Sequence, residues 1–292
     1  MKPAPFSYVA PSSINEVVAL LDDYGDTAKL LAGGQSLLPM MNFRLARPAY
    51  IIDLNRLDGL DYIIERDDTL VVGAMTRHSR LERSDLIAQH YPLLQEAVTF
   101  IGHTAIRNRG TIGGSLAHAD PAAELPAILL AYGGSVCVQG PSGMREVAAE
   151  DLFLTYFTTT LAANEMLTEV RLPRWPSATG WCFLEESRRH GDFAMVGVAA
   201  LVTLDTEGQC TQAAVTITGV GGVPYNVNEV ASLLPGHPAA AERIAQVAQA
   251  AADGVDPEGD IHASAEFRRH LSGVLTQRAL TRAVERARQA AA

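Results

Sequence analysis

Two glycine pairs, each close to hydroxyl residues, most constrain how this chain can fold. They lie in the segments Gly33–Ser36 and Thr111–Ser115. Glycine lets backbone N–H groups approach an anion without a Cβ in the way, and successive N–H groups in such a turn form a nest for negative charge. Nearby hydroxyl groups add further donors. Two nests from separate parts of the chain could grip a diphosphate from both sides, so the sequence favours a fold that brings these segments together.

Neither segment matches the common nucleotide-binding motifs. The G-x-G-x-x-G of a Rossmann fold and the Walker lysine loop are both missing from the sequence. A nicotinamide site or a nucleoside triphosphate site is therefore disfavoured. Because glycine pairs are also frequent in plain turns, a purely structural role for each pair remains an open alternative.

Hydrophobic patterning predicts helices and strands in mixed order around these segments. Ser13–Glu16 is a capping box that starts a helix ending at Gly25, and residues 28–32 read as a buried strand that runs into the first glycine pair. Gly110–Pro126 follows no periodicity, so we expect a binding loop there. Further strands are expected at 50–54, 69–74 and 166–173, and a helix with a break at Pro92 is expected at 81–100.

The last third of the chain predicts a separate sheet with helices. Residues 175–180 are typical of a linker. Beyond them, 199–204 and 214–218 flank a turn and predict a hairpin, and helices at 239–253 and 264–288 should cover one face of that sheet. We therefore expect one domain at 1–177, with subdomains of about 1–56 and 57–177, and a second domain at 178–292.

Composition excludes several classes of function. The net charge of −10 at pH 7 argues against nucleic-acid binding, because phosphate neutralisation needs clustered Lys and Arg. The sequence has no apolar run of the roughly 20 residues that cross a bilayer, and its start lacks the layout of a secretory signal. These features predict a cytoplasmic protein without a membrane span.

Cysteine and histidine spacing predicts no metal on this chain. Cys137, Cys182 and Cys210 lie far apart, whereas an iron–sulfur cluster takes about four thiolates at compact spacing. Any such cluster must therefore sit on another chain. The histidines also lack metal-ligand spacing. A G-x-S-x-G elbow and a convincing catalytic triad are both missing, so we assign no catalytic side chain.

Four segments resemble one protein family, in the same order and over nearly the whole chain. They are Leu31–Met41, Ile106–Pro121, Ser187–Ala194 and Ile261–Leu271. Together they are similar to the FAD-binding medium subunit of the carbon monoxide dehydrogenase and xanthine dehydrogenase family of molybdenum hydroxylases. The resemblance implies an α+β fold, with a two-subdomain FAD-binding domain of the vanillyl-alcohol-oxidase (PCMH) type. A C-terminal antiparallel sheet with helices would follow it.

The resemblance also implies which residues hold the cofactor. Residues 32–36 and 111–115 would bind the FAD pyrophosphate, and residues 29–31 would flank it. Ile101 would lie near the isoalloxazine ring, Glu124 would hydrogen-bond the cofactor, and Phe193 would replace an aromatic residue that can be Tyr in relatives. The full set is Lys29, Leu30, Leu31, Ala32, Gly33, Gly34, Gln35, Ser36, Leu37, Ile101, Ile106, Asn108, Thr111, Ile112, Gly113, Gly114, Ser115, His118, Glu124, Leu167 and Phe193.

In the family, this subunit relays electrons and does not touch the organic substrate. FAD would be bound noncovalently, while a small subunit holds two iron–sulfur clusters and a large subunit holds the molybdenum cofactor. The expected assembly is a heterotrimer, or a dimer of heterotrimers, that passes electrons to an external acceptor. The segments Ser187–Ala194 and Asn108–Gly110, the second of which leads into the second glycine pair, resemble the corresponding segments of family members that oxidise N-heterocycles.

Two other functions remain open at this point. A free-standing FAD oxidase of the same fold would act directly on a small substrate, and a non-catalytic scaffold would use the glycine pairs only as turns. Four arginines near the proposed flavin segments could stabilise reduced flavin or meet an acidic partner, or they could simply be solvated surface groups. They are Arg107, Arg109, Arg188 and Arg189.

Overall fold

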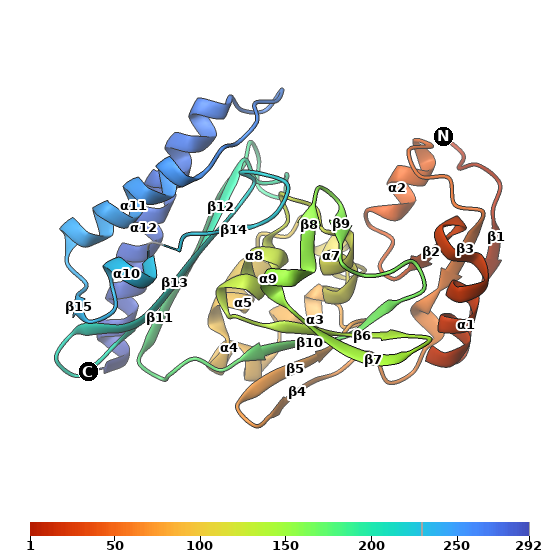
Figure 1. Cartoon of the computed structure of the whole chain (residues 1–292), viewed down its shortest axis with the longest axis horizontal. Helices are drawn as coiled ribbons and strands as arrows, with labels where there is room; N and C mark the ends of the chain where they lie inside the picture. The colour runs from red at the N-terminus through yellow and green to blue at the C-terminus, as the bar shows by residue number, and fades with distance from the viewer. Residues whose placement is uncertain (229, 292) are drawn as a thin grey trace.

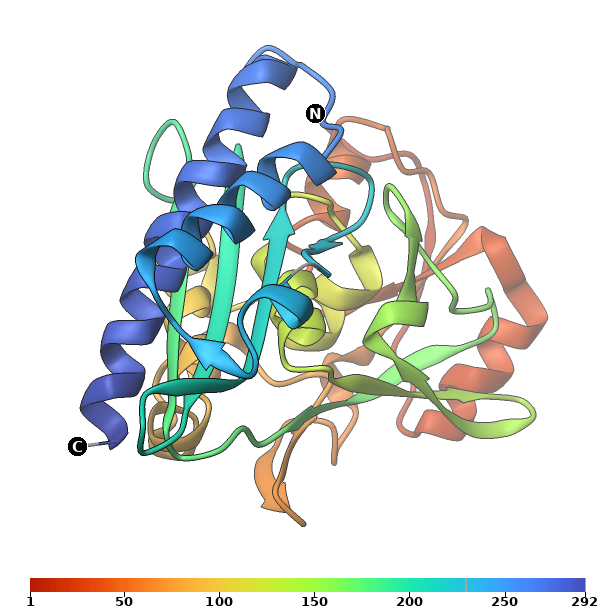
Figure 2. The ribbon, with the colours of Figure 1, turned by 60° about the vertical axis from the view of Figure 1, so that its left-hand side comes forward.

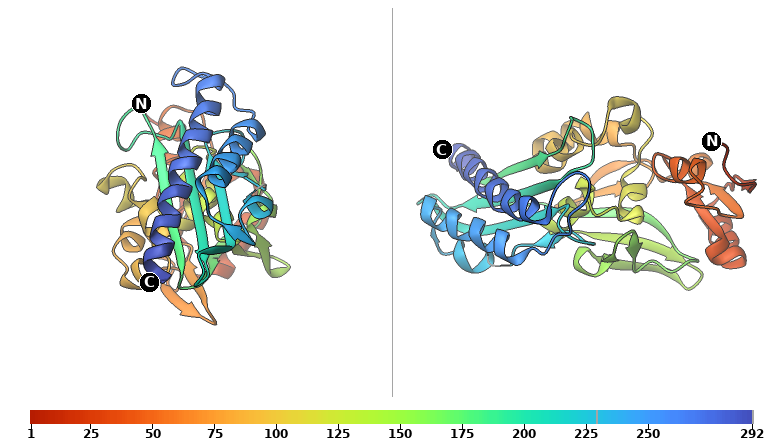
Figure 3. Two further views of the ribbon diagram at one scale, coloured as in Figure 1. Left: turned by 90° about the vertical axis from the view of Figure 1, so that its left-hand side faces the viewer. Right: turned by 90° about the horizontal axis from the view of Figure 1, so that it is seen from above.

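The computed structural model describes residues 1–228 and 230–291. Its three larger β-sheets follow one another along the longest axis of the molecule (Figure 1). The N-terminal sheet lies at one end, the middle sheet follows, and the sheet near the C-terminus lies under two helices at the other end (Figure 3). The α+β class predicted from the sequence is confirmed.

The N-terminal sheet is small and parallel. Its strands β1 (Ser7–Val9), β2 (Ala28–Leu31) and β3 (Tyr50–Asp53) are arranged in the order β1-β3-β2. Helix α1 (Ile14–Tyr24) joins β1 to β2, and α2 (Leu37–Asn42) lies between β2 and β3. The predicted cap is confirmed, because the Ser13 side chain accepts a hydrogen bond of 3.2 Å from the N–H of Glu16.

The middle sheet is antiparallel and has five strands. Its order is β4 (Ile63–Arg66), β5 (Thr69–Gly73), β10 (Met166–Pro173), β6 (Ser135–Gly140) and β7 (Gly143–Ala148). Short helices separate β5 from β6: α3 (His78–Glu82), α4 (Asp85–His90), α5 (Pro92–Val98), α6 (Thr104–Arg107), α7 (Ile112–His118) and α8 (Glu124–Ala131). After β7 come α9 (Ala149–Leu152) and the hairpin of β8 (Phe153–Thr155) and β9 (Thr158–Thr159).

The segment Gly110–Pro126, expected to be a loop, is largely helical. It contains α7 and the first turn of α8. Thr111 caps α7, because its hydroxyl oxygen accepts a hydrogen bond of 3.1 Å from the N–H of Gly114. Gly113 packs so closely that a Cβ there would lie 2.6 Å from the Cβ of Ala74. Tertiary packing thus overrides the low helix propensity of the glycines, which the sequence pattern alone could not reveal.

The C-terminal sheet is antiparallel and lies between two helical layers. Its strands are β11 (Thr179–Glu186), β12 (Val196–Leu204), β13 (Gln209–Thr218) and β14 (Tyr225–Asn226), and β15 (His237–Pro238) also pairs with β13. The predicted hairpin is confirmed as β12–β13, whereas β11 begins inside the expected linker. Helices α11 (Ala241–Gly254) and α12 (Ala265–Ala291) cover one face, as predicted (Figure 2), and α10 (Val230–Leu233) precedes them.

The opposite face of this sheet packs against the middle of the molecule. All nine residues of β12 are buried. Phe183, Ala199 and Leu201 belong to the same apolar cluster as α5, α8 and the middle sheet. One hydrophobic core therefore continues across the linker near Ser177.

An ion pair reinforces this junction. Arg286 on α12 donates to both carboxylate oxygens of Glu96 on α5, at 3.0 and 3.1 Å, and to the carbonyl of Trp181 at 2.7 Å. Glu96 also accepts a hydrogen bond of 3.0 Å from the N–H of Phe183. Both charged side chains are mostly buried, with 29% and 22% of their surface exposed.

We expect Arg286→Met to lower the free energy of unfolding by about 2 kcal/mol, because Glu96 would keep its buried charge without its partner. Urea denaturation would measure the loss. Arg278→Met changes an exposed position on the same helix and should stay within about 0.5 kcal/mol of the wild type. Equal stability of the two variants would show that the ion pair contributes nothing.

Candidate functional site

The structure brings the two glycine segments into direct contact. A Cβ at Gly33 would lie 2.5 Å from the carbonyl oxygen of Arg109 and 2.8 Å from the Cα of Gly110. A Cβ at Gly114 would lie 3.6 Å from the Cβ of Ala32. The backbone of the first segment therefore lies against the approach to α7, as a shared anion site requires.

The first segment offers free hydrogen-bond donors. It follows β2 and ends where α2 begins, and Gly34 has a φ of +74°, which favours glycine. Within residues 1–228 and 230–291, no acceptor pairs with the backbone N–H groups of Gly33, Gly34, Gln35 or Ser36. The side chain of Gln35 turns back to the carbonyl of Gly33 at 3.1 Å. Four consecutive free N–H groups suit a phosphate.

The second segment differs from the expected nest. Gly113 donates its N–H to the carbonyl of Ala74 at 3.0 Å, and Gly114 donates to the Thr111 hydroxyl. The N–H of Ser115 is also used, bonding the Thr111 carbonyl at 3.0 Å. The expectation that Gly113 and Gly114 offer free N–H groups to an anion is therefore wrong. What this segment can still offer an anion is the hydroxyl of Ser115, because Thr111 is only 1% exposed and its side-chain oxygen caps α7.

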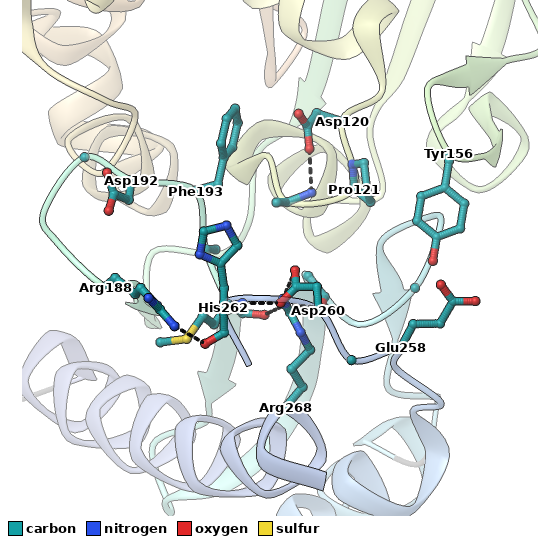
Figure 4. Close-up of a pocket in the computed structure, with 17 residues that line it drawn as sticks. Asp120, Pro121, Tyr156, Arg188, Asp192, Phe193, Glu258, Asp260, His262 and Arg268 are labelled. Atoms are coloured by element: carbon teal, nitrogen blue, oxygen red, sulfur yellow. Dashed lines mark hydrogen bonds and ion pairs between the residues drawn. The ribbon is translucent and has the colours of Figure 1, made fainter. Parts of the chain in front are cut away.

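A cavity of about 610 Å³ lies near the other end of α7, between the middle of the molecule and the C-terminal sheet. Figure 4 shows Tyr156 from the β8–β9 hairpin, Phe193 from the β11–β12 connection and His262 from the loop before α12. Phe193 has 69% of its surface exposed. Helix α7 begins within the second glycine segment and ends two residues before the cavity residue Asp120, and its seven residues span about 10 Å at 1.5 Å for each residue.

Several predicted residues lie near this cavity. A Cβ at Gly191 would be 2.4 Å from the ring of His103 and 3.1 Å from the carbonyl of Gly102, so the segment after Ile101 touches the connection that carries Phe193. The His118 ring lies 5.1 Å from the ring of Phe157, the neighbour of Tyr156. Ile106 packs on Gly102, where a Cβ would meet its side chain at 2.8 Å.

The remaining predicted residues are spread over the elements that support the glycine segments. Lys29, Leu30 and Leu31 lie on β2, and Leu37 begins α2. Ile112 and Leu167 are buried core residues at 2% and 6% exposure, and Asn108 is exposed at the end of α6. Their contact with a cofactor stays a prediction.

Two carboxyl groups with raised pKa values interact in the structure, and the sequence predicted only one of them, Glu124, as a site residue. Glu124, in the first turn of α8, is 8% exposed, and burial raises its pKa to about 7. Glu185 on β11 was not predicted; burial, together with repulsion from Glu124, raises its pKa to about 8. Its Oε2 is buried without a hydrogen-bond partner among the described residues. Only the approach of the Glu185 side chain to Glu124 in the folded chain, which no local pattern encodes, could have indicated Glu185.

The four arginines near the proposed flavin segments have different roles. Arg107 is 9% exposed and bonds Glu82 at 2.9 and 3.2 Å, so it supports the fold and is not a free cation. Arg188 lines the cavity and donates to the carbonyl of Ile261 at 2.9 Å. Arg109 and Arg189 are exposed.

Among the residues that the structure describes, no three His, Cys, Asp or Glu side chains are grouped to hold a metal ion. The cysteines Cys137, Cys182 and Cys210 are buried free thiols. Within the same residues, no helix has the length and apolar character to cross a membrane.

Comparison with known proteins decides the family. The family described as "FAD binding domain in molybdopterin dehydrogenase" matches residues 4–175, and "CO dehydrogenase flavoprotein C-terminal domain" matches residues 181–283. The chain belongs to the FAD-binding medium subunits of the carbon monoxide dehydrogenase and xanthine dehydrogenase family. It is thus an oxidoreductase subunit whose complex carries the molybdenum cofactor on other subunits, as predicted.

The medium subunit is similar to known proteins over nearly its whole length. It is 43% identical to the 6-hydroxypseudooxynicotine dehydrogenase complex subunit alpha of Paenarthrobacter nicotinovorans, over 99% of this chain and 97% of that one. It is 37% identical to caffeine dehydrogenase subunit beta of a Pseudomonas species, over 98% and 97%. The structure of carbon monoxide dehydrogenase from Hydrogenophaga pseudoflava superposes with a TM-score of 0.96 at 37% identity, covering 98% of this chain and 99% of that one.

The contact at Gly33 generates a first prediction. Gly33→Ala should force the two segments apart, because its Cβ would clash with backbone atoms that cannot rotate away. Such overpacking typically costs 1–3 kcal/mol, so the dissociation constant for FAD should rise about ten- to hundredfold. Flavin fluorescence quenching would measure it.

The control for this variant is Gly133→Asn. Gly133 has a φ of +64° and open space around it, a conformation that Asn tolerates. This variant should bind FAD like the wild type. If Gly33→Ala also binds FAD normally, the contact between the segments does not shape the site.

The buried carboxyls generate a second prediction. Because the folded state holds protons to about pH 7 and pH 8 on groups with ordinary pKa values of 4.5, the stability of the apoprotein should fall as pH rises from about 4.5 to about 8 and level off above that. The slope can reach about 1.4 kcal/mol per pH unit for each retained proton. Glu124→Gln should flatten it in urea denaturation, whereas Glu186→Gln, at an exposed position on β11, should not. An unchanged slope in Glu124→Gln would contradict the buried pair.

Proposed function

We propose that this medium subunit binds one noncovalent FAD and relays electrons from an iron–sulfur subunit to an external acceptor. The supporting observation is the arrangement at the two ends of α7. The two glycine segments meet at its N-terminal end, and the cavity that contains Phe193 lies near its C-terminal end. An elongated dinucleotide needs such a pair of subsites, one for its diphosphate and one for its ring system.

The chain's own residues would bind and orient the cofactor. The free N–H groups at 33–36 would bind the diphosphate, and the hydroxyl of Ser115 on α7 would add a donor from the other side. Phe193 would contact the ring, and charged and polar residues such as Asp120 and Arg188 would line the cavity around it. Bound flavin couples one-electron and two-electron transfer, which explains why the chain needs no nucleophile or general base.

We also propose that the companions are a small subunit with two iron–sulfur clusters and a large subunit with the molybdenum cofactor, in a heterotrimer or a dimer of heterotrimers. Within this chain, residues 1–177 would form the FAD-binding domain, with subdomains of about 1–56 and 57–177, and 178–292 the C-terminal domain. We infer a cytoplasmic complex. The acidic charge of −10 makes nucleic acid an unsuitable partner.

The substrate class we propose for the whole complex is an N-heterocycle. Support comes from the names of similar proteins, among them caffeine dehydrogenase and nicotine 6-hydroxylase, the latter 38% identical over 97% of this chain. Quinoline 2-oxidoreductase from Pseudomonas putida has a chain that superposes with a TM-score of 0.93 at 36% identity. Carbon monoxide dehydrogenases match about as well, so the substrate has to be identified on the large subunit.

Purification from the native source tests the relay. We expect two companion chains, one FAD for each medium subunit, and iron and molybdenum that remain with the companions when the subunits are separated. Acid denaturation should release the flavin. A lone flavoprotein that oxidises a small substrate, or flavin attached covalently to the cavity residue His262, would instead establish the free-standing oxidase.

A further inference from the structure

A chain of side-chain hydrogen bonds connects the two glycine segments. Asn55 donates from its Nδ2 to the carbonyl of Ala32 at 2.9 Å. Its Oδ1 accepts a hydrogen bond of 2.5 Å from Nη2 of Arg77. Nη1 of Arg77 donates to the carbonyl of Arg109. The carbonyl just before Gly33 is thus tied to the carbonyl just before Gly110 through two side chains.

The Asn55 side chain of this bridge is fixed by hydrogen bonds to neighbouring residues. Asn55 lies in the 3-10 turn Leu54–Arg56, and Asp53 accepts hydrogen bonds from its N–H at 2.9 Å and its Nδ2 at 2.5 Å. Tyr8 in turn donates to Asp53 at 2.5 Å. The orientation of the Asn55 amide is therefore fixed by the N-terminal sheet.

The backbone around Arg77 is fixed to the second segment. The N–H of His78 bonds the carbonyl of Gly110, and the N–H of Ile112 bonds the carbonyl of Thr76, both at 3.0 Å. Arg77 itself is partly buried. The backbone around Arg77 is thus hydrogen-bonded to the residues at the second glycine segment. Its guanidinium group extends to Asn55, next to the N-terminal sheet that carries the first segment.

We propose that Asn55 and Arg77 are positioning residues that set the spacing of the two glycine segments, and through it the affinity for the FAD diphosphate. This inference rests on the proposed position of the diphosphate. Neither side chain needs to touch the cofactor. Arg77 has the geometry for the role because its planar fork can serve two acceptors at once, which a lysine ammonium matches poorly.

The fold does not depend on this bridge alone. An apolar cluster also joins the N-terminal and middle sheets through Val17, Ile52, Met75 and Met166. Variants that cut the bridge should therefore still fold, with the two segments free to separate. The bridge can then be tested through ligand affinity in the folded protein.

The test compares Arg77→Met, Asn55→Ala and the double variant in the purified complex, stripped of FAD and titrated with FAD and with ADP, a diphosphate probe. Losing charged hydrogen bonds of this kind should weaken both ligands by a similar factor of about ten to a hundred. Because both residues belong to one bridge, the double variant should bind FAD and ADP with about the same affinity as the single variant that binds them more weakly. Arg77→Lys should recover part of the affinity.

Arg80→Met is the matched control. Arg80 lies one turn away on α3 and likewise makes two hydrogen bonds, to the carbonyl and the carboxylate of Asp61 at 2.8 and 2.7 Å, but neither involves a glycine segment. It should bind FAD normally. The proposal is overturned if Arg77→Met binds FAD within twofold of the wild type. It is also overturned if the two single effects simply add, or if Arg80→Met weakens FAD equally.

Gly33→Ala separates this inference from the proposed function. If that variant loses affinity while Arg77→Met does not, the diphosphate site stands and the bridge is only structural. If Gly33→Ala and Arg77→Met both bind FAD and ADP like the wild type, the diphosphate lies elsewhere, which overturns both the proposed diphosphate site and the role of the bridge, while the electron relay is tested separately by the purification.

Discussion

The close approach of backbone to backbone at Gly33 is the constraint on which the rest of the site depends. The carbonyl of Arg109 and the Cα of Gly110 lie where a side chain at position 33 would begin. A contact of this kind cannot be relieved by a rotamer change, so only glycine allows the two segments to meet. Because Gly33 follows strand β2 of the N-terminal sheet and Gly110 directly precedes the segment that forms α7, this contact helps to hold the two parts together where we propose the diphosphate site.

A second set of contacts lies at the other end of α7, where the C-terminal sheet is hydrogen-bonded to the connection between α7 and α8. The single O–H of Thr218 is shared between the carbonyl oxygens of Pro121 and Ala123, which lie 2.7 and 2.8 Å away, and the N–H of Gly219 donates to the carbonyl of Pro121 at 2.9 Å. The body of α8 packs on β12 and β13. The sheet that closes the cavity therefore also buries Glu124, and the raised pKa of this carboxyl follows from how the domains pack together.

Local chemistry explains which parts of the fold the sequence predicts. The cap at Ser13, the strand Met166–Pro173 and the β12–β13 hairpin are each specified by residues next to one another, and each forms as expected. The failures involve distant partners. Helix α7 packs Gly113 against Ala74, and the raised pKa of Glu185 depends on burial and on the distant residue Glu124. For the site, glycine spacing indicated the two segments where we propose the diphosphate, but it could not reveal that the N–H groups of Gly113 and Gly114 are already hydrogen-bonded within the protein.

Arginine shows why position in the sequence is a poor guide to function here. Irregular segments leave carbonyl oxygens without ladder partners, and a guanidinium with five donors can satisfy several of them at once. Arg268 bonds the carbonyls of Met195 and Gly219, and Arg107 bonds those of Ile101 and Gly102. Arg77, which lies outside every segment that resembles the family, is the one that joins the two glycine segments. These arginines shape the loops that form the site, so their importance follows from the carbonyls they bond and not from how near they lie to a motif.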